Sequence, residues 1–343
     1  MTTVHHEGLD LPALHRFLVD SGIAVDGELR AHLISGGKSN LTYGIVDDTS
    51  RWVLRRPPTA GLTPSAHDVA REYRITSALV DSGVPVARPV ALCEDDAVMG
   101  APFTVVEHVE GRVVRSRSDL DALSDDEIDA CIGELVRVLG GLHDVDYVAA
   151  GLGGFGRPDG YVARQVKLWA SQWERVRTRE LPDLERLHAR LAESIPESPA
   201  PTIVHGDYRI DNTILDPADT GRVAAVVDWE LSTLGDPNTD LALMCVYRNT
   251  ALDDVLGFDA AWTSPRLPSA DDLVQRYATV TGRDVPHRDF YLALANFKLA
   301  VISEGINHRW RVGATVGDGF DKAAEAVPVL VAAGLAAIDG AAS

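Results

Sequence analysis

The sequence predicts an α+β fold, in which a strand-rich first third precedes a mostly helical remainder. Short apolar runs bounded by glycine and proline turns, which is the pattern of strands, end near residue 107. Beyond that point the apolar residues recur at helical spacing. A chain of 343 residues is long enough for one large or two small domains. The change of pattern divides the chain into a strand-rich part, residues 1–107, and a helical part, residues 108–343, and these are the two candidate domains.

The composition argues against several classes of protein. A net charge of −19 opposes binding to nucleic acid; it suits a cationic substrate, but it is also ordinary for an acidic soluble protein. The three scattered cysteines lack a CxxC pair, so a disulfide framework or zinc site is not expected. No leader-like segment opens the chain, and the longest apolar run, residues 327–338, is shorter than a membrane helix and predicts a packed terminal helix. We expect a cytoplasmic protein, monomeric or homodimeric.

The first domain opens with a helix at residues 9–19, followed by strands at 29–34 and 41–46. A glycine-rich turn joins these strands, and glycine lets backbone N–H groups approach phosphates because it has no Cβ. The triplet GKS does not form a Walker A loop, since His32 stands where that motif needs glycine and a strand follows. A plain hairpin turn remains the alternative. The candidate phosphate-binding residues are Gly36, Gly37, Lys38, Ser39 and Asn40.

Three further strands and one helix complete the first domain. A strand at residues 52–56 is stopped by two prolines, and a helix is predicted at 65–80 with Ser65 as its N-cap. An edge strand follows within residues 84–92, and a fifth strand lies at 103–107. Five strands with one helix give a small sheet domain.

The second domain is predicted to be built from helices. Ser124 and Glu127 have the spacing of a capping box at the start of the first of them. Trp169 and Trp173, four residues apart on a later helix, are expected to pack in the core. The letters GxGxxG occur at residues 151–156, but no strand precedes them, so a dinucleotide site is not predicted. The expected helices span residues 124–142, 161–177, 185–192, 236–247, 270–279, 290–308 and 323–338.

The chemistry is concentrated between residues 203 and 241. His205-Gly206-Asp207 follows a short apolar run, and Asn212 stands five residues beyond Asp207. A second apolar run ends in Asp228. This is the spacing of a phosphoryl-transfer catalytic loop, in which the Asp accepts the hydroxyl proton and the Asn holds Mg²⁺. A carboxylate and an amide oxygen, completed by phosphates, suit that ion.

This segment, together with GDPNTDLAL at residues 235–243, resembles the aminoglycoside phosphotransferase and choline kinase family. The resemblance extends from about residue 33 to about residue 310, and within the family it is greatest to the kinase-like domains fused to acyl-CoA dehydrogenases. It implies a protein-kinase-like two-lobe fold, in which residues 1–107 and residues 108–343 are the two domains, with a five-stranded antiparallel sheet in the small lobe. It also implies ATP, or GTP, and Mg²⁺ as cofactors and a small-molecule hydroxyl as acceptor.

The resemblance assigns roles to residues that spacing alone leaves open. Asp207 is implied as the base, with Asn212 and Asp228 holding Mg²⁺. Arg55 stands where the family carries a phosphate-binding Lys, and Glu72 is its implied partner. The implied adenine-binding hinge is Glu107, His108 and Val109. The implied supporting residues are His205, Arg209, Glu230 and Asp240. Glu230 stands beside the metal-binding Asp, and Asp240 is implied as a buried anchor of the catalytic loop. For Arg209 the alternative is an exposed surface position.

Two kinds of function remain open at this stage. The first is a phosphotransferase acting on a hydroxyacyl thioester-like metabolite or on an aminoglycoside. The second is a nucleotide-binding pseudokinase with a regulatory role, which only the Arg55 departure favours. A protein kinase is a weaker third possibility, because no Ala-Pro-Glu activation segment occurs.

Overall fold

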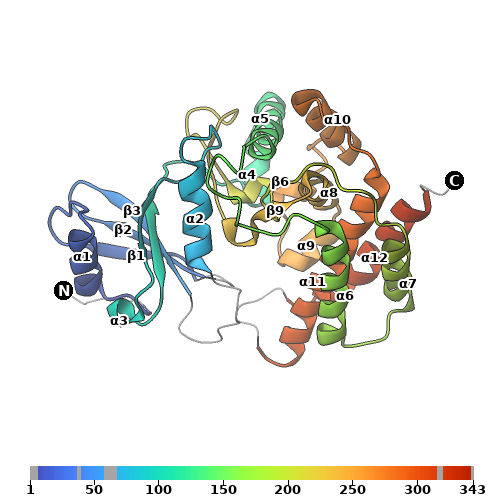
Figure 1. Cartoon of the computed structure of the whole chain (residues 1–343), viewed down its shortest axis with the longest axis horizontal. Coiled ribbons are helices and arrows are strands. Elements are labelled where there is room, and N and C mark those ends of the chain that lie inside the picture. Colours follow the sequence, from blue (N-terminus) through green and yellow to red (C-terminus); the bar gives the residue numbers. More distant parts are fainter. Residues whose placement is uncertain (1–6, 37–39, 58–67, 315–319, 341–343) are drawn as a thin grey trace. The chain divides into compact units, whose positions relative to one another are not determined.

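The computed structural model describes residues 7–36, 40–57, 68–314 and 320–340. The chain divides into two compact units (Figure 1). The first comprises Met1–Glu110 and Ala224–Ser232, and the second comprises Gly111–Val223 and Thr233–Ser343. The sequence does not predict that residues 224–232 group with the first unit.

A five-stranded sheet forms the centre of the first unit. Its strands are ordered β1-β2-β3-β5-β4, and all neighbours are antiparallel. The predicted edge strand, β4, lies at one edge. The strands span Arg30–Gly36 (β1), Leu41–Val46 (β2), Arg51–Arg56 (β3), Pro89–Cys93 (β4) and Phe103–Glu107 (β5).

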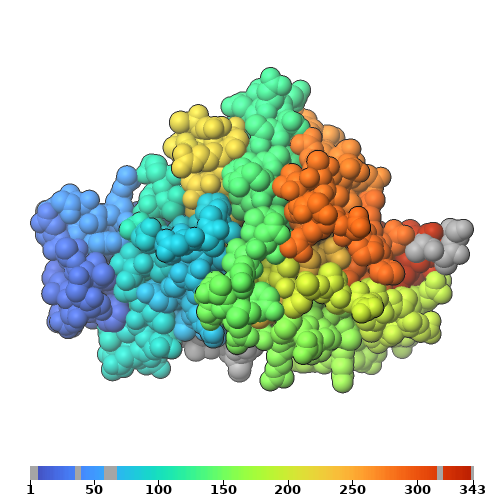
Figure 2. All heavy atoms as spheres, turned by 45° about the horizontal axis from the view of Figure 1, so that its top comes forward, coloured from blue at the N-terminus to red at the C-terminus, as the bar shows by residue number. Residues whose placement is uncertain are grey.

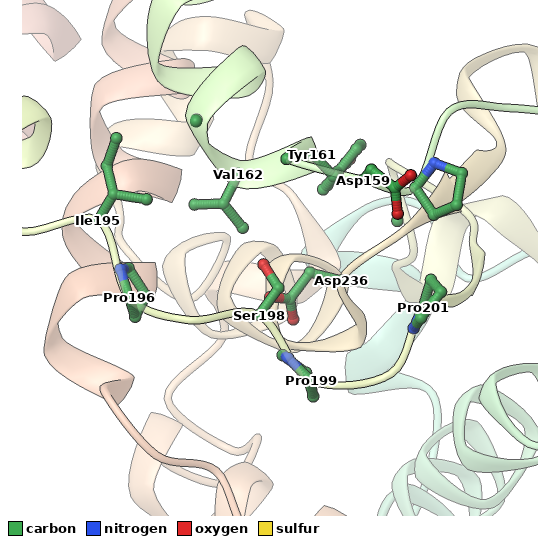
Figure 3. A pocket seen from close by; sticks show the side chains of 13 residues that line it. Asp159, Tyr161, Val162, Ile195, Pro196, Ser198, Pro199, Pro201 and Asp236 are labelled. Carbon is green, nitrogen blue, oxygen red and sulfur yellow. The ribbon is translucent and has the colours of Figure 1, made fainter.

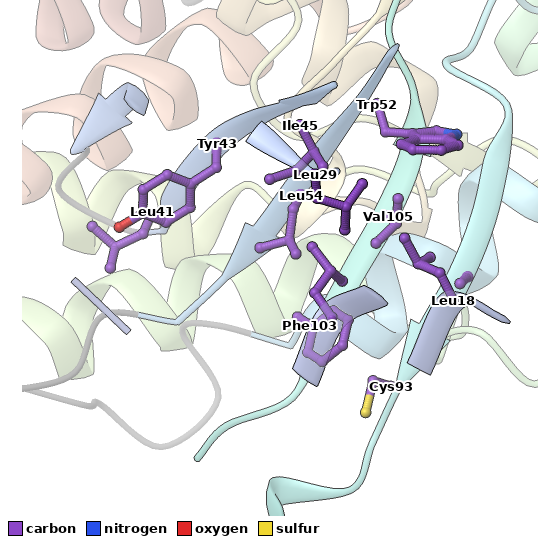
Figure 4. Packing of buried hydrophobic residues seen from close by; sticks show 12 residues of the cluster. Leu18, Leu29, Leu41, Tyr43, Ile45, Trp52, Leu54, Cys93, Phe103 and Val105 are labelled. Atoms are coloured by element: carbon purple, nitrogen blue, oxygen red, sulfur yellow. The ribbon is translucent and has the colours of Figure 1, made fainter. Parts of the chain in front are cut away.

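One face of this sheet packs on the helix α1, Leu11–Asp20, to form an apolar core (Figure 4). Because side chains alternate along a strand, every second residue of β2 and β3 enters this core, including Ile45 and Leu54. The rings of Phe17 on α1 and Phe103 on β5 meet edge to face at 5.0 Å. The same alternation turns Arg55 to the face opposite Leu54.

Helix α2, Val69–Leu79, packs on β4 and β5. It begins after Asp68, whose side chain accepts a hydrogen bond from the Arg71 amide at 2.9 Å. The predicted start at residue 65 is therefore wrong, and Ser65 lies outside the described residues. A four-residue helix, α3 (Asp96–Met99), follows β4.

Hydrogen bonds with two parts of the first unit explain why residues 224–232 belong to it. The amide of Val226, in β8 (Val223–Val226), donates to the Pro85 carbonyl at 2.8 Å. The guanidinium of Arg71 on α2 donates to the Ser232 carbonyl at 2.9 Å. A short 3₁₀ helix, η2 (Trp229–Leu231), lies between these anchors, and its Trp229 is buried.

The second unit is mostly helical, with α11 at its centre, against which α6, α7, α8 and α12 pack (Figure 1). The predicted capping box of α5 is present, since Ser124 and Glu127 bond each other's backbone amides. The helices are α4 (Arg117–Asp121), α5 (Asp125–His143), α6 (Tyr161–Val176), α7 (Pro182–Glu193), α8 (Pro237–Val246), α9 (Ala251–Leu256), α10 (Ala270–Thr281), α11 (Arg288–Arg311) and α12 (Ala323–Gly340).

Short strands and turns join these helices. Strand β6, Thr202–Val204, pairs antiparallel with β9, Thr233–Gly235, and brings the catalytic segment beside the start of α8. The 3₁₀ helix η1 (Ile210–Asn212) leads into β7 (Thr213–Leu215), and η3 spans Ala261–Thr263. On the surface α10 lies beside α5 (Figure 2), where Arg276 pairs with Asp129 at 2.5 Å.

Helix α12 is the one described helix that is long and apolar enough to cross a membrane, judged by length and composition alone. The expectation that no apolar segment reaches this length is therefore wrong. The helix packs on α11 and α7, and a Cβ on its Gly334 would come within 2.7 Å of the Leu187 side chain. The close approach to α7 agrees with the prediction of a packed terminal helix.

Candidate active site

Asp240 on α8 anchors the catalytic loop. Its fully buried carboxylate accepts hydrogen bonds from the backbone amides of His205, at 2.6 Å, and Gly206, at 2.7 Å. Buried backbone amides need such partners, so Asp240 fixes the course of the loop just before Asp207. The predicted anchoring contact is present.

A buried histidine supports Asp240 in turn. His143, the last residue of α5, places Nε2 3.4 Å from the Asp240 carboxylate and Nδ1 2.7 Å from the Tyr277 hydroxyl. Burial acts to raise the pKa of Asp240, but the hydrogen bond and charge of His143, with help from His205 and the Gly206 amide, lower it overall. No pattern in the sequence predicts this role for His143.

Two side chains donate hydrogen bonds to the Asp207 carboxylate, one to each oxygen. The Asn212 side-chain amide donates to Asp207 Oδ2 at 3.0 Å and to the Asp207 carbonyl at 2.8 Å. The Tyr247 hydroxyl donates to Oδ1 at 2.5 Å, and the Asp207 amide donates to His205 Nδ1 at 3.2 Å. The structure thus brings together Asp207 and Asn212, as their spacing predicts, and adds Tyr247. No local signal marks Tyr247, which follows the last turn of α8.

Arg209 is held beside the same carboxylate. Its guanidinium lies 3.3 Å from Asp207 and 2.7 Å from Asp211, and it stacks 5.6 Å above the Tyr247 ring. The side chain is only 14% exposed, so the alternative of an ordinary surface arginine is wrong. Burial raises the pKa of Asp211, and the Arg209 charge opposes this shift. A partly buried cation therefore lies beside the Asp207 carboxylate.

Replacing Tyr247 with Phe is expected to slow turnover about tenfold while the protein stays folded. Burial and the charge of Asp207 raise the pKa of Tyr247 well above its usual value, so its hydroxyl remains a donor to Asp207. Losing that donor loosens the carboxylate without removing it, and one hydrogen bond to a charged group is worth about 1.5–3 kcal/mol. Steady-state kinetics beside a thermal unfolding curve would check this. Tyr147→Phe, on a loop, is the control and should leave turnover unchanged.

The first unit contains a second charged cluster, built on Arg55, Glu72 and Asp228. One guanidinium nitrogen of Arg55 bonds Glu72 on α2, and the other lies 3.2 Å from Asp228. The expected pair of Arg55 with Glu72 is therefore present, and Asp228 joins it. Burial acts to lower the pKa of Arg55, but the charges of Glu72, Asp228 and Glu230 outweigh it and raise that pKa. The guanidinium is thus fixed as a cation.

Asp228 has an unusual backbone conformation. Its φ of 66° is left-handed, and only one other non-glycine residue among those described shares this feature. Such a conformation costs about 1–2 kcal/mol and persists where the surroundings enforce it, which is common at functional sites. Here the Trp229 indole donates to the Val226 carbonyl at 2.9 Å, and the Ser232 hydroxyl donates to the Trp229 carbonyl at 2.7 Å.

Replacing Arg55 with Met is expected to lower the free energy of unfolding by about 3–5 kcal/mol, because it leaves Glu72 buried without its cation. Arg55→Lys should recover part of this loss, since an ammonium keeps the charge but not the fork that reaches two carboxylates. Urea unfolding of the three proteins would measure the difference. Equal stability of the Met variant and the unmodified protein would contradict the prediction.

The remaining predicted nucleotide contacts are described only in part. Gly37, Lys38 and Ser39 lie outside the described residues, while Gly36 ends β1. Asn40 is buried, and its side-chain oxygen has no hydrogen-bond partner in the described part of the chain.

In the predicted hinge, sheet hydrogen bonds already occupy two amides. Glu107 donates to Arg88 at 2.8 Å, and His108 donates to Arg51 at 3.1 Å. Of the three hinge amides, only that of Val109 donates no backbone hydrogen bond within the described structure, so it is the one that could contact an adenine.

Each unit offers an oxygen donor of the kind that Mg²⁺ takes when it is bound mainly through a nucleotide. Among the described residues no group of three or more His, Cys, Asp or Glu side chains is placed to hold a metal. Mg²⁺ needs only one or two protein oxygens when phosphates supply the others. Asn212 uses its amide nitrogen toward Asp207, which leaves its oxygen available, and Asp228 is 36% exposed.

A cavity of about 300 Å³ in the second unit lies apart from these residues (Figure 3). The start of α6, the segment 195–201 and Asp236 line it. Asp236 caps α8 through the Asn238 amide and accepts the Tyr291 hydroxyl at 2.6 Å, so its polar groups are used in the fold. This cavity includes none of the predicted site residues and does not mark the active site.

A five-stranded antiparallel sheet, followed by a helical unit with an HGDxxxxN loop, defines a kinase-like protein. The chain belongs to the phosphotransferase enzyme family, whose model matches residues 30–283. It is also similar to a crystal structure of a Ralstonia eutropha protein provisionally named an aminoglycoside phosphotransferase. The two are 34% identical, with a TM-score of 0.82 over 96% of this chain and 98% of that one. The predicted family and kinase-like fold are confirmed.

Two relatives are acyl-CoA dehydrogenase family members. Member 11 of Gallus gallus is 36% identical over 317 residues, which is 90% of this chain and 40% of that protein. Member 10 of Mus musculus is 37% identical over 281 residues, 81% of this chain and 26% of that protein. The chain thus spans about a quarter to two fifths of these relatives, and the predicted similarity to this branch is confirmed.

Proposed function

We propose that this protein is an ATP- and Mg²⁺-dependent phosphotransferase that moves the γ-phosphate to a hydroxyl group of a small molecule. The observation that carries the proposal is the Asp207 carboxylate, bonded to Asn212 and set on a loop that Asp240 fixes. In phosphoryl transfer the protein mainly positions the reactants and neutralises charge, and this arrangement suits both tasks. The first unit would bind the nucleotide, and the second would bind the acceptor.

The proposed reaction forms one bond and breaks one. The acceptor oxygen bonds to the γ-phosphorus, and the bond from that phosphorus to the bridging oxygen of ADP breaks. The hydroxyl proton passes to an Asp207 carboxylate oxygen and then to solvent. Arg55 would bind phosphate oxygens, while Asn212 and Asp228 would hold the ion. When bound, Mg²⁺ supplies positive charge against the phosphates.

Two acceptor classes are considered within this function. We favour a hydroxylated acyl thioester or similar metabolite, because the relatives include acyl-CoA dehydrogenase family members. An aminoglycoside is the second class, favoured by the name given to the Ralstonia eutropha protein and by the acidic charge of −19.

The test is ADP release from ATP and Mg²⁺ with a panel of hydroxyacyl thioesters, aminoglycosides, macrolides and choline-like amines. Selective release with one class supports the proposal and identifies the acceptor. Tight ATP binding by calorimetry without any acceptor-dependent release would favour the pseudokinase alternative, in which Arg55 replaces the usual Lys without supporting transfer. Absence of ATP binding would refute the nucleotide-dependent reaction.

A further inference from the structure

Helix α11 carries a half-buried lysine, Lys298, next to the catalytic loop. Lys298 lines a small cavity in the second unit whose accessible volume is about 30 Å³. Gly206 of the loop and Trp169 of α6 line the same cavity, together with both polar and apolar side chains of α6, α8 and α11, among them Gln165 and Thr239. The space is large enough for a group of a few atoms, because a single water needs about 10–15 Å³ by this measure.

The contacts of Lys298 leave its charge without a direct counterion. Nζ donates to the Gly206 carbonyl at 2.9 Å and lies 5.6 Å from the centre of the Trp169 ring. Within the described chain no carboxylate lies within 4.0 Å of Nζ. An ammonium has three N–H donors, so two remain for another partner. Burial lowers the pKa of Lys298, while the charges of Asp207 and Asp240 oppose that shift.

Trp169 does not have the role that its spacing predicts. Trp173 is buried in the core, as expected, but Trp169 is only partly buried and forms a wall of the cavity. Its indole donates to Gln165 at 3.2 Å, which holds the ring beside Lys298. A neutral donor would satisfy the Gly206 carbonyl equally well, so the loop contact by itself does not explain a half-buried cation here.

We propose that Lys298 and Trp169 form the acceptor subsite that binds a carbonyl-type oxygen, in a carboxylate or a thioester, located near the hydroxyl to be phosphorylated. This inference rests on the proposed phosphotransferase function. The two remaining N–H donors of Lys298 bind the oxygen, and Gly206, the neighbour of Asp207, places that oxygen close to the reacting hydroxyl. A cationic aminoglycoside group would meet a like charge at this point, so the subsite selects against that class.

The test uses acceptors that share one secondary hydroxyl and differ in their end group. The probes are 3-hydroxybutyrate, its coenzyme A thioester, 2-butanol and 4-amino-2-butanol, assayed by ADP release and by calorimetric binding. The variants are Lys298→Met, which keeps the length of the side chain without the charge, and Lys298→Arg. Lys167→Met, at an exposed position on α6, is the matched control.

Lys298→Met should weaken the binding of 3-hydroxybutyrate or of its thioester about 10- to 100-fold, as expected for one hydrogen bond to a charged group. It should leave 2-butanol and ATP binding unchanged, and Lys298→Arg should retain part of the preference. The probe that loses more affinity shows whether Lys298 binds a carboxylate oxygen or a thioester oxygen. An equal loss for all probes would reduce Lys298 to a support of the Gly206 carbonyl and overturn the proposal. So would tighter binding of 4-amino-2-butanol than of 3-hydroxybutyrate by the unmodified protein.

The calorimetric arm separates the two proposals. If the unmodified protein releases no ADP with any acceptor, the phosphotransferase proposal fails. The subsite is still supported if 3-hydroxybutyrate or its thioester binds and Lys298→Met weakens that binding. If neither compound binds the unmodified protein, the subsite is refuted, whatever the outcome with other acceptors.

Discussion

Replacing Asp207 with Asn is expected to lower kcat by about 10²–10⁴-fold, the range that a positioned general base contributes. An amide cannot accept the hydroxyl proton. Its NH₂ group would also face a hydrogen-bond donor, because Asn212 and Tyr247 donate to the two carboxylate oxygens. ATP affinity should stay nearly unchanged, since Asp207 acts on the acceptor. Single-turnover kinetics and calorimetry on the same preparation would measure both quantities.

Asp216→Asn provides the control for this experiment. Asp216 directly follows β7, where it accepts the Ala218 amide at 2.9 Å and pairs with the exposed Arg222 at 3.3 Å. Such surface pairs contribute little, so the variant should retain full turnover. Substantial turnover in Asp207→Asn would show that another group takes the proton, and Asp211, paired with Arg209, would be tested next.

The distance along the chain between two interacting residues decides whether the sequence can predict their contact. Asp207 and Asn212 are five residues apart, so one turn of chain brings them together and the spacing alone predicts their contact. Strand and helix periodicity is equally local. By contrast, 40 residues separate Tyr247 from Asp207, and 92 separate Lys298 from Gly206. Only the packing of α8 and α11 places these residues at the loop, and no local pattern records it.

Two predictions at helices failed for a related reason. Helix α2 begins after Asp68, whose side chain caps it by accepting the Arg71 amide, three residues later than predicted. Trp169 and Trp173 have the same residue type and helical spacing, yet only Trp173 points into the core. Residues four apart on a helix point in directions that differ by about 40°. The neighbouring helices therefore determine which of the two tryptophans is buried.

Replacing Asp240 with Ala is expected to lower the free energy of unfolding by about 3–5 kcal/mol. The substitution leaves the buried amide of His205 and the half-buried amide of Gly206 without their acceptor, and a buried orphan costs about 1–3 kcal/mol. It also leaves His143 beside an empty position. Asp284→Ala, at an exposed loop position, is the control and should change stability by less than about 0.5 kcal/mol.

The pH dependence gives a second, independent test of Asp240. In the folded protein the pKa of Asp240 lies below its unfolded value, which is near 4. The main reason is that the contacts of Asp240 with His143 outweigh the effect of burial. Its contribution to stability is therefore complete above about pH 4 and is lost as the pH falls through the folded pKa. Urea unfolding from pH 7 down to pH 3 should show a smaller acid loss in Asp240→Ala than in the unmodified protein. Parallel curves would mean that other carboxylates dominate acid unfolding and that Asp240 anchors the loop without its charge.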